Sequence, residues 1–163
     1  MTGSTQERVE QLEEMVQQLT EQARLGALVD RFVSGLDHVD PAWADEAWYR
    51  SLFTEDIVLD MPNGVHQGIA GVPEFFGVPK KQWARTHHMT SNHIVEVTGG
   101  TATGRANVQA THVPHGPDSP LFTGGARYEF EAVRTPHGWR ISRLTTAVTW
   151  IDDRTRTAAD AAR

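Results

Sequence analysis

The sequence predicts an α+β protein in which a curved antiparallel sheet wraps around helices. Two observations lead to this prediction. Apolar residues at helical spacings fill the first half of the chain, and four long strand candidates separated by turns fill the second half. The length of 163 residues suits one domain. A sheet curved in this way forms a cone with one open mouth, which is a natural cavity for a small molecule.

The N-terminal residues predict a long helix in two parts. Over residues 5–25, apolar residues recur at spacings of 3, 4, 3 and 4, which is a coiled-coil seam of barely two heptads. Gly26 interrupts this seam, and residues 26–38 then carry the wider apolar stripe of a helix packed on a core. We expect residues 1–25 to be a helical extension that contacts another protein copy or, alternatively, a frayed and solvated arm.

A second helix, a strand and a third helix are expected next. Asp40 and Pro41 fit the N-cap and first position of a helix that ends near Phe53. Three further segments follow in order: a short strand at 56–61, a short helix at 69–76 and a loop at 77–86.

The second half predicts four strands joined by hairpin-type turns, which makes the sheet antiparallel. The strand candidates are 88–97, 101–113, 121–135 and 139–151. Residues 152–163 are polar and rich in alanine, and we expect a disordered tail there. The domain itself is expected over residues 26–151.

The composition excludes several classes of protein. There is no cysteine, which removes disulfides, thiolate nucleophiles and zinc–cysteine sites. No apolar run approaches the roughly 20 residues that a membrane span needs, and the polar, acidic start fits neither a signal nor a transit peptide. The formal charge is −6 without a Lys/Arg cluster. We therefore expect a cytoplasmic protein that binds neither nucleic acid nor a membrane.

The strand at 101–113 places His112 at the end of an apolar face. The other residues of that face are mostly small, which predicts a hollow rather than a filled core: Ala102, Gly104, Ala106, Val108 and Ala110. A histidine beside a hollow is a candidate catalytic group. The alternative is a core histidine satisfied by one hydrogen bond.

Asp37 extends the apolar stripe of the first domain helix, four residues after Val33. A carboxylate beside an apolar cavity favours an imidazole partner, and such a pair fixes the tautomer of the ring and makes it a positioned base. The alternative is a helix-end aspartate in water. His87 and His88 open the next strand, and the pattern leaves open which of its faces points inward.

Metal and cofactor sites lack support in the sequence. The histidines could supply metal ligands, but no HExxH motif or facial-triad spacing is present, and we expect no metal. No P-loop, GxGxxG or GxSxG motif occurs either, so nothing points to a nucleotide, a flavin or another cofactor.

The sequence resembles the SnoaL-like branch of the nuclear transport factor 2-like superfamily, and within it the scytalone dehydratase-like group. The segments that carry the resemblance span roughly residues 25–151: LVDRFVSGLDHVD, LFTEDIVLDMPNGVHQGIAGVPEFF, THHMTSNHIVEVTGGTATGRANVQATH and GGARYEFEAVRTPHGWRISRLTTAVTW. The resemblance implies a homodimer, or a larger homo-oligomer, built through the open sheet face. The superfamily includes dehydratases, isomerases, polyketide cyclases, epoxide hydrolases and non-catalytic binders, so it fixes the fold more firmly than the function.

By position, the resemblance places the dehydratase's helix aspartate on Asp37 and its two strand histidines on His88 and His112. It implies that the histidines act as acid and base in an elimination and that the aspartate orients one of them. Two tyrosines that polarise the dehydratase's substrate fall on Leu36 and Met61, so scytalone itself is not the expected substrate. Further residues are predicted to contact the substrate: Trp43, Trp48, Tyr49, Met61, Asn92 and Tyr128.

We therefore expect a cofactor-free acid–base enzyme of the dehydratase or isomerase type. Its partner would be a hydrophobic small molecule with a carbonyl group, such as a polyketide or another secondary metabolite. One alternative is a cyclase that closes a ring or opens an epoxide with the same residues. Another is a small-molecule-binding module without catalysis.

Overall fold

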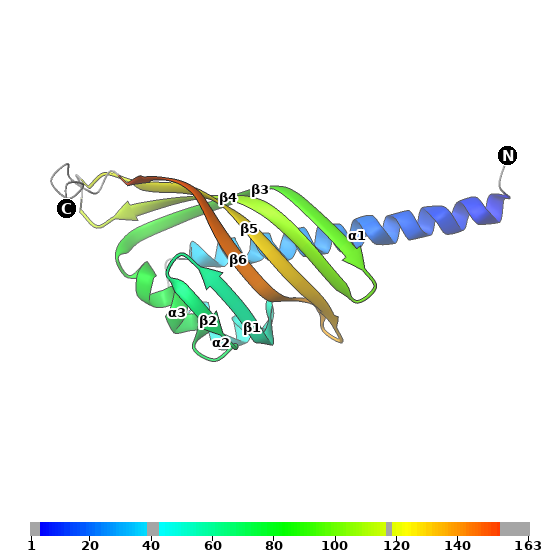
Figure 1. Cartoon of the computed structure of the whole chain (residues 1–163), viewed down its shortest axis with the longest axis horizontal. Coiled ribbons are helices and arrows are strands. Elements are labelled where there is room, and N and C mark those ends of the chain that lie inside the picture. The colour runs from blue at the N-terminus through cyan, green and yellow to red at the C-terminus, as the bar shows by residue number, and fades with distance from the viewer. Residues whose placement is uncertain (1–3, 39–42, 117–118, 154–163) are drawn as a thin grey trace.

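The computed structural model describes residues 4–38, 43–116 and 119–153. It contains helices and strands in the order α1 (Thr5–Leu36), α2 (Glu46–Arg50), β1 (Phe53–Met61), β2 (Gly64–Gln67), α3 (Val72–Lys80), β3 (Trp83–Thr98), β4 (Thr101–Pro114), β5 (Phe122–Thr135) and β6 (Gly138–Asp153). Figure 1 shows α1 running along the sheet and beyond it. Among these residues, no helix is long and apolar enough to cross a membrane.

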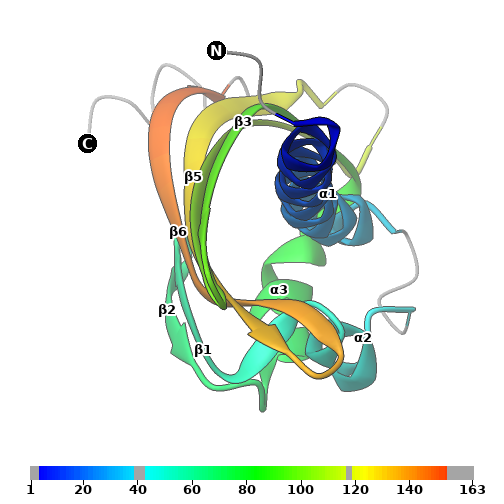
Figure 2. The ribbon, with the colours of Figure 1, turned by 90° about the vertical axis from the view of Figure 1, so that its right-hand side faces the viewer.

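The six strands form one curved sheet that does not close, in the order β2-β1-β6-β5-β4-β3. Figure 2 shows the sheet curving around α1 and α3, which confirms the predicted α+β fold. The strands from β3 to β6 pair as antiparallel neighbours, as predicted. In contrast to the expected pattern, β1 pairs with β6 in parallel. Hairpin signals report only on consecutive strands, so they do not bear on this long-range pair.

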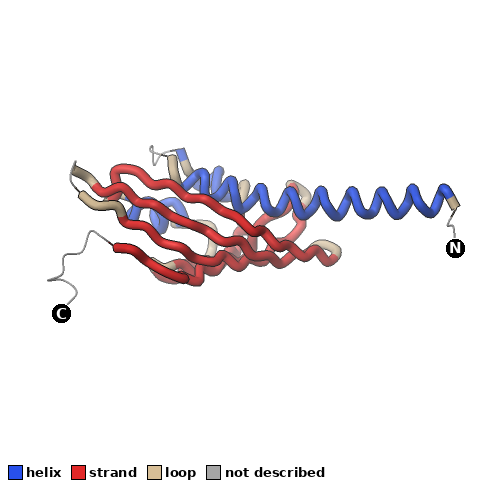
Figure 3. Tube along the Cα trace, turned by 90° about the horizontal axis from the view of Figure 1, so that it is seen from above, coloured by secondary structure: helices blue, strands red, loops and turns tan. Residues whose placement is uncertain are grey.

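Helix α1 is continuous through Gly26 and does not divide into two helices. It begins with a capping box, in which the Ser4 hydroxyl accepts from the Glu7 N–H at 3.2 Å and the Glu7 carboxylate accepts from the Ser4 N–H at 2.6 Å. Residues 4–20 are exposed, and burial begins at Glu21. Figure 3 shows this first part of α1 extending past the sheet. A glycine inside a helix costs only about 1 kcal/mol, which the buried residues around Gly26 offset.

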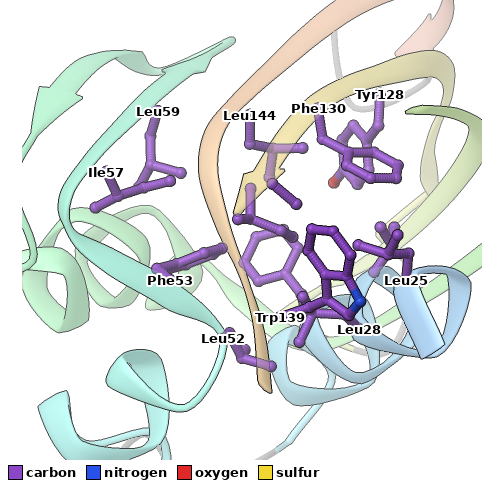
Figure 4. Packing of buried hydrophobic residues seen from close by; sticks show 14 of the residues in the cluster. Leu25, Leu28, Leu52, Phe53, Ile57, Leu59, Tyr128, Phe130, Trp139 and Leu144 are labelled. Atoms are coloured by element: carbon purple, nitrogen blue, oxygen red, sulfur yellow. The ribbon is translucent and has the colours of Figure 1, made fainter. Parts of the chain in front are cut away.

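The core lies between α1 and the concave face of the sheet. Leu25, Val29 and Phe32 of α1 are fully buried there. The Phe32 ring meets the rings of Phe53 and Phe76 edge-on, each at 5.3 Å between centroids. Figure 4 shows residues from separate strands converging in this cluster. The core therefore fixes α1 across the strands whose inner faces surround the cavity described below.

Several element boundaries differ from the expected ones. Helix α2 begins at Glu46 because the Asp45 carboxylate accepts from the Trp48 N–H at 2.8 Å. The predicted N-cap at residue 40 lies outside the described residues. Strand β2 has no counterpart in the sequence prediction, and β3 begins within the expected loop. Strand β6 continues to Asp153, so the predicted start of the tail at residue 152 is too early. Strands extend further than the pattern suggests because paired neighbours satisfy their backbone groups.

Candidate active site

Asp37 and His88 form a close pair at the end of α1. Asp37 is the C-cap residue of α1, and His88 lies within β3. The Asp37 Oδ1 atom lies 2.6 Å from His88 Nδ1, and Oδ2 accepts from the backbone N–H of His88 at 2.7 Å. The two side chains are 21% and 11% exposed, respectively. Both carboxylate oxygens therefore bind the same residue, which holds the imidazole in one orientation.

The electrostatics keep this carboxylate ionised. Burial raises the pKa of Asp37, but hydrogen bonds from His88 and Thr86 outweigh it and hold the pKa below its ordinary value. An ionised acceptor at Nδ1 keeps the proton on that nitrogen. The Nε2 atom of His88 is then the basic nitrogen.

His112 lies beside this pair on the neighbouring strand β4. Its ring is nearly perpendicular to that of His88, with 5.5 Å between the centroids. Trp83 and Phe122 pack around it at 4.9 and 5.4 Å. Burial, aided by the charge of His88, lowers the pKa of His112 to about 4. The His112 ring is therefore neutral near pH 7, and its Nδ1 atom is buried without a hydrogen-bond partner among the described residues.

His88 and His112 both line a cavity of about 340 Å³ on the concave side of the sheet. The apolar wall includes aromatic residues that sequence reasoning missed as site residues: Phe76, Trp83, Phe122 and Trp150. Trp83 was missed because residues 77–86 lack an alternating pattern and were expected to form a loop. The cavity is large enough for a flat, one- or two-ring molecule, which would lie within reach of both imidazoles.

Two of the residues predicted to bind substrate line this cavity, namely Met61 and Tyr128. Leu36, which takes a tyrosine position in the resemblance, lines it as well. Tyr128 is 4% exposed, and burial raises its pKa. Tyr49 lies elsewhere: its ring stacks with those of Phe53 and Phe76 in the core and does not line the cavity.

Trp43, Trp48 and Asn92 also lie off the cavity wall, which corrects their expected positions. Trp43 stacks on His38 with 4.2 Å between the ring centroids. Trp48 packs over Gly35, where a Cβ atom would lie 2.2 Å from the indole. Asn92 is exposed at an irregularity of β3 and has a φ of 54°. Helical spacing of aromatic residues signals burial, and it does not distinguish packing on a helix from lining a cavity.

Within the described parts of the chain, no three His, Asp or Glu side chains gather as a metal site requires. What the arrangement offers chemically is an ionised Asp37 carboxylate bound to His88, a neutral His112 ring and an apolar enclosure.

Comparison with known proteins assigns the chain to a family. A model of the SnoaL-like domain matches residues 17–145. The chain belongs to the SnoaL-like family. A search of curated protein sequences finds no match for this SnoaL-like protein.

Solved structures of low sequence identity share the fold of this SnoaL-like protein. A candidate scytalone dehydratase from Novosphingobium aromaticivorans is 21% identical, with a TM-score of 0.72 over 86% of this chain and 91% of that one. A nuclear transport factor 2-like superfamily protein from Salmonella enterica is 17% identical, with a TM-score of 0.68 over 80% and 92%. The hexachlorocyclohexane dehydrochlorinase LinA-type3 from Novosphingobium barchaimii is 19% identical, with a TM-score of 0.69 over 82% and 90%. At these identities the likeness concerns the fold.

Proposed function

We propose that this SnoaL-like protein is a cofactor-independent acid–base enzyme, a lyase or isomerase, acting on a small apolar molecule with a carbonyl group. The observation that carries the proposal is the Asp37–His88 pair, 2.6 Å apart, at the wall of an apolar cavity that His112 also lines. Two neighbours in fold, a candidate dehydratase and a dehydrochlorinase, have names that denote eliminations. Their names support this reaction class over the other chemistries of the fold.

In the proposed reaction, His88 Nε2 removes a proton from the carbon next to the carbonyl group. The C–H electron pair forms the enolate, and Asp37 stabilises the resulting imidazolium. For a dehydratase, the enolate re-forms the carbonyl and expels the β-hydroxyl group. That group takes the proton back from His88 and leaves as water. For an isomerase, His88 returns the proton to another carbon instead.

His112 has a narrower role in this proposal than the sequence led us to expect. With a pKa of about 4, its ring carries no transferable imidazolium proton near pH 7. A neutral ring still donates one N–H hydrogen bond, and we assign that donor to the carbonyl oxygen as negative charge develops there. A single base, His88, then serves both proton-transfer steps.

The base can be tested without knowing the substrate. The flat probe 5-nitrobenzisoxazole fits a cavity of about 340 Å³ and opens to a coloured phenolate when a base removes its ring C–H proton. We expect the wild type to accelerate this opening and His88→Gln to lose at least about 100-fold of the acceleration. His137→Gln, an exposed histidine in the β5–β6 turn, is the matched control.

Two results decide between these alternatives, and the cyclase needs a further experiment. A wild-type rate in His88→Gln would refute the assigned base. Binding of the probe without acceleration by the wild type would favour a non-catalytic binding module. A cyclase that uses the same base would open the probe too, and only product analysis with ring-closing substrates would distinguish it.

A further inference from the structure

The only two lysines of the chain, Lys80 and Lys81, lie next to each other at the end of α3. They differ in their surroundings. Lys80 lines the cavity, whereas Lys81 is exposed and does not line it. A lysine near a helix C-terminus interacts favourably with the helix dipole, whichever way its side chain points. That effect accounts for both lysines but not for the placement of Lys80 in the cavity wall.

Lys80 has no carboxylate bound to it in the described part of the chain. Its Nζ atom donates to the backbone carbonyl of His38, just after α1. None of the ion pairs among the described residues includes Lys80. Burial lowers the pKa of Lys80, and the charge of Asp37 opposes this. Asp37 itself is already bound to His88.

Lys80 is the one lysine or arginine among the described residues of the cavity wall. Apart from the two histidines, the other polar side chains of the wall are neutral: Asn63, Gln82, Thr86, Tyr128 and Thr146. No Asp or Glu belongs to the described wall. An anionic group that reaches Lys80 from the cavity would therefore meet one ammonium group, and no Asp or Glu among the described wall residues would compete for it. The apolar surroundings strengthen such an attraction.

We infer that the substrate is an anion, a flat apolar molecule with a carboxylate or a similar acidic group whose oxygens bind Lys80. This inference deepens the acid–base proposal and rests on its cavity. Lys80 would fix one end of the molecule, and the apolar body would lie against Trp83 and Phe122 within reach of His88.

The test compares two non-reactive probes of nearly equal shape, 2-naphthoate and 2-naphthalenemethanol, by isothermal titration calorimetry. We expect the wild type to bind naphthoate about tenfold more tightly than the alcohol, as a charge-assisted hydrogen bond provides. Lys80→Met should remove this preference and leave binding of the alcohol within about twofold. Lys81→Met changes the net charge by the same amount and should keep the preference.

Equal binding of both probes by the wild type would overturn the inference, as would an unchanged preference in Lys80→Met. An equal loss in Lys81→Met would also overturn it, because it would trace the effect to the general field of the protein. None of these measurements needs turnover. Failure here leaves the assignment of His88 intact, and failure of the benzisoxazole test leaves this inference intact.

A second inference concerns the exposed start of α1. All residues from 4 to 20 are exposed. Four apolar side chains in this stretch are between 43% and 63% exposed: Val9, Leu12, Val16 and Leu19. These four residues occupy the a and d positions of two heptads, with valine at a and leucine at d. That choice favours parallel two-stranded coiled coils.

The charges around this seam fit a second copy of the same helix. In a parallel pair, residue 8 at position g faces residue 13 at position e of the other helix, which places Arg8 opposite Glu13. No like charges face each other at e and g within this stretch, because the remaining acidic residues lie at outward positions: Glu7, Glu10 and Glu14. We propose that residues 5–20 form a parallel coiled coil with a second copy of this chain.

Sedimentation equilibrium of the full chain tests this pairing. We expect a dimer or a multiple of it for the wild type, and a lower mass for the double variant Leu12→Glu/Leu19→Glu. The matched control Gln11→Glu/Gln18→Glu adds the same charge one residue away from the seam and should keep the wild-type mass. Arg8→Glu should weaken association, and Arg8→Glu/Glu13→Arg should restore it.

A monomeric wild type would overturn the proposed coiled coil, and the apolar seam would then have to bind a different partner. A wild-type mass in Leu12→Glu/Leu19→Glu would overturn it too, since association would then use another surface. Restoration by the charge swap is specific to the parallel arrangement.

Discussion

The Asp37 carboxylate binds His88 twice, with Oδ1 at 2.6 Å from the ring Nδ1 and Oδ2 at 2.7 Å from the backbone N–H. One side chain thus fixes both the strand position and the ring orientation of its partner. The pair connects the end of α1 with the middle of β3, across 51 residues of sequence. Any change that shifts α1 along the sheet will therefore also shift the proposed base.

Asp37→Asn should reverse the tautomer of His88. The histidine presents two donors to the carboxylate, whereas an asparagine side chain offers only one acceptor oxygen and an NH₂ group. If the oxygen takes the backbone N–H, the NH₂ group faces Nδ1, and the ring proton moves to Nε2. We expect the benzisoxazole rate to fall by about 10² to 10⁴. Nitrogen NMR of the ring should report the new tautomer, and a wild-type rate with the original tautomer would contradict this account.

His112 should make the stability of the protein sensitive to mild acid. Its pKa is about 4 in the folded protein because of burial, against 6.5 ordinarily. Between these values the unfolded chain binds a proton that the folded protein does not, so stability falls as the pH falls from 6.5 towards 4. His112→Gln should flatten the fall in melting temperature over this window, while His137→Gln keeps it. Thermal unfolding followed by circular dichroism measures both slopes, and equal slopes for His112→Gln and wild type would argue against the buried ring.

Asp37 acts in a separate pH window. Its folded pKa lies below the ordinary 3.8, so its contribution to stability is present above that value and is lost as the pH falls further. Asp37→Asn should consequently reduce the loss of stability below about pH 4. The fall in melting temperature between pH 6.5 and pH 4 should remain, because it depends on His112.

Glu21→Gln should loosen the attachment of α1 to the β5–β6 hairpin. The buried Glu21 carboxylate accepts hydrogen bonds from the indole N–H of Trp139 and from Arg134, which hold its pKa below the ordinary value. Glutamine keeps the size and removes the charge, so the free energy of unfolding should fall by about 1–2 kcal/mol. Urea unfolding checks this. Glu14→Gln, on the exposed part of the same helix, should change it by less than about 0.5 kcal/mol.

Gly35→Ala should destabilise the protein although alanine is the better helix former. A Cβ atom at residue 35 would lie 2.2 Å from the Trp48 indole, so that ring must move. Such overpacking typically costs about 1–3 kcal/mol. Gly77→Ala in α3 is the control, since nothing lies within 4 Å of its added Cβ, and we expect a gain of up to about 1 kcal/mol. Similar effects of the two variants in urea unfolding would show that Trp48 does not restrict residue 35.

Sequence reasoning reached Asp37 and His112 because each continues or ends a local apolar pattern, and the family resemblance pointed to both of them and to His88. It did not place Lys80 or Trp83 in the cavity wall, since both lie in a stretch without periodicity. It predicted that Trp43 and Trp48 contact the substrate, whereas neither of them lines the cavity. The contact of Trp48 with Gly35 depends on how α2 packs on α1, which no spacing within either helix encodes.

Helical and strand periodicity are properties of neighbouring residues, so the sequence was enough to predict the α+β class, the antiparallel strands of the second half and the long first helix. Three features emerge only in the folded chain: α1 passes Gly26 unbroken, β1 lies parallel to β6, and Asp37 binds His88. These features depend on contacts between residues far apart in the chain. Burial and hydrogen bonding stabilise these contacts, and both exist only after the chain has folded.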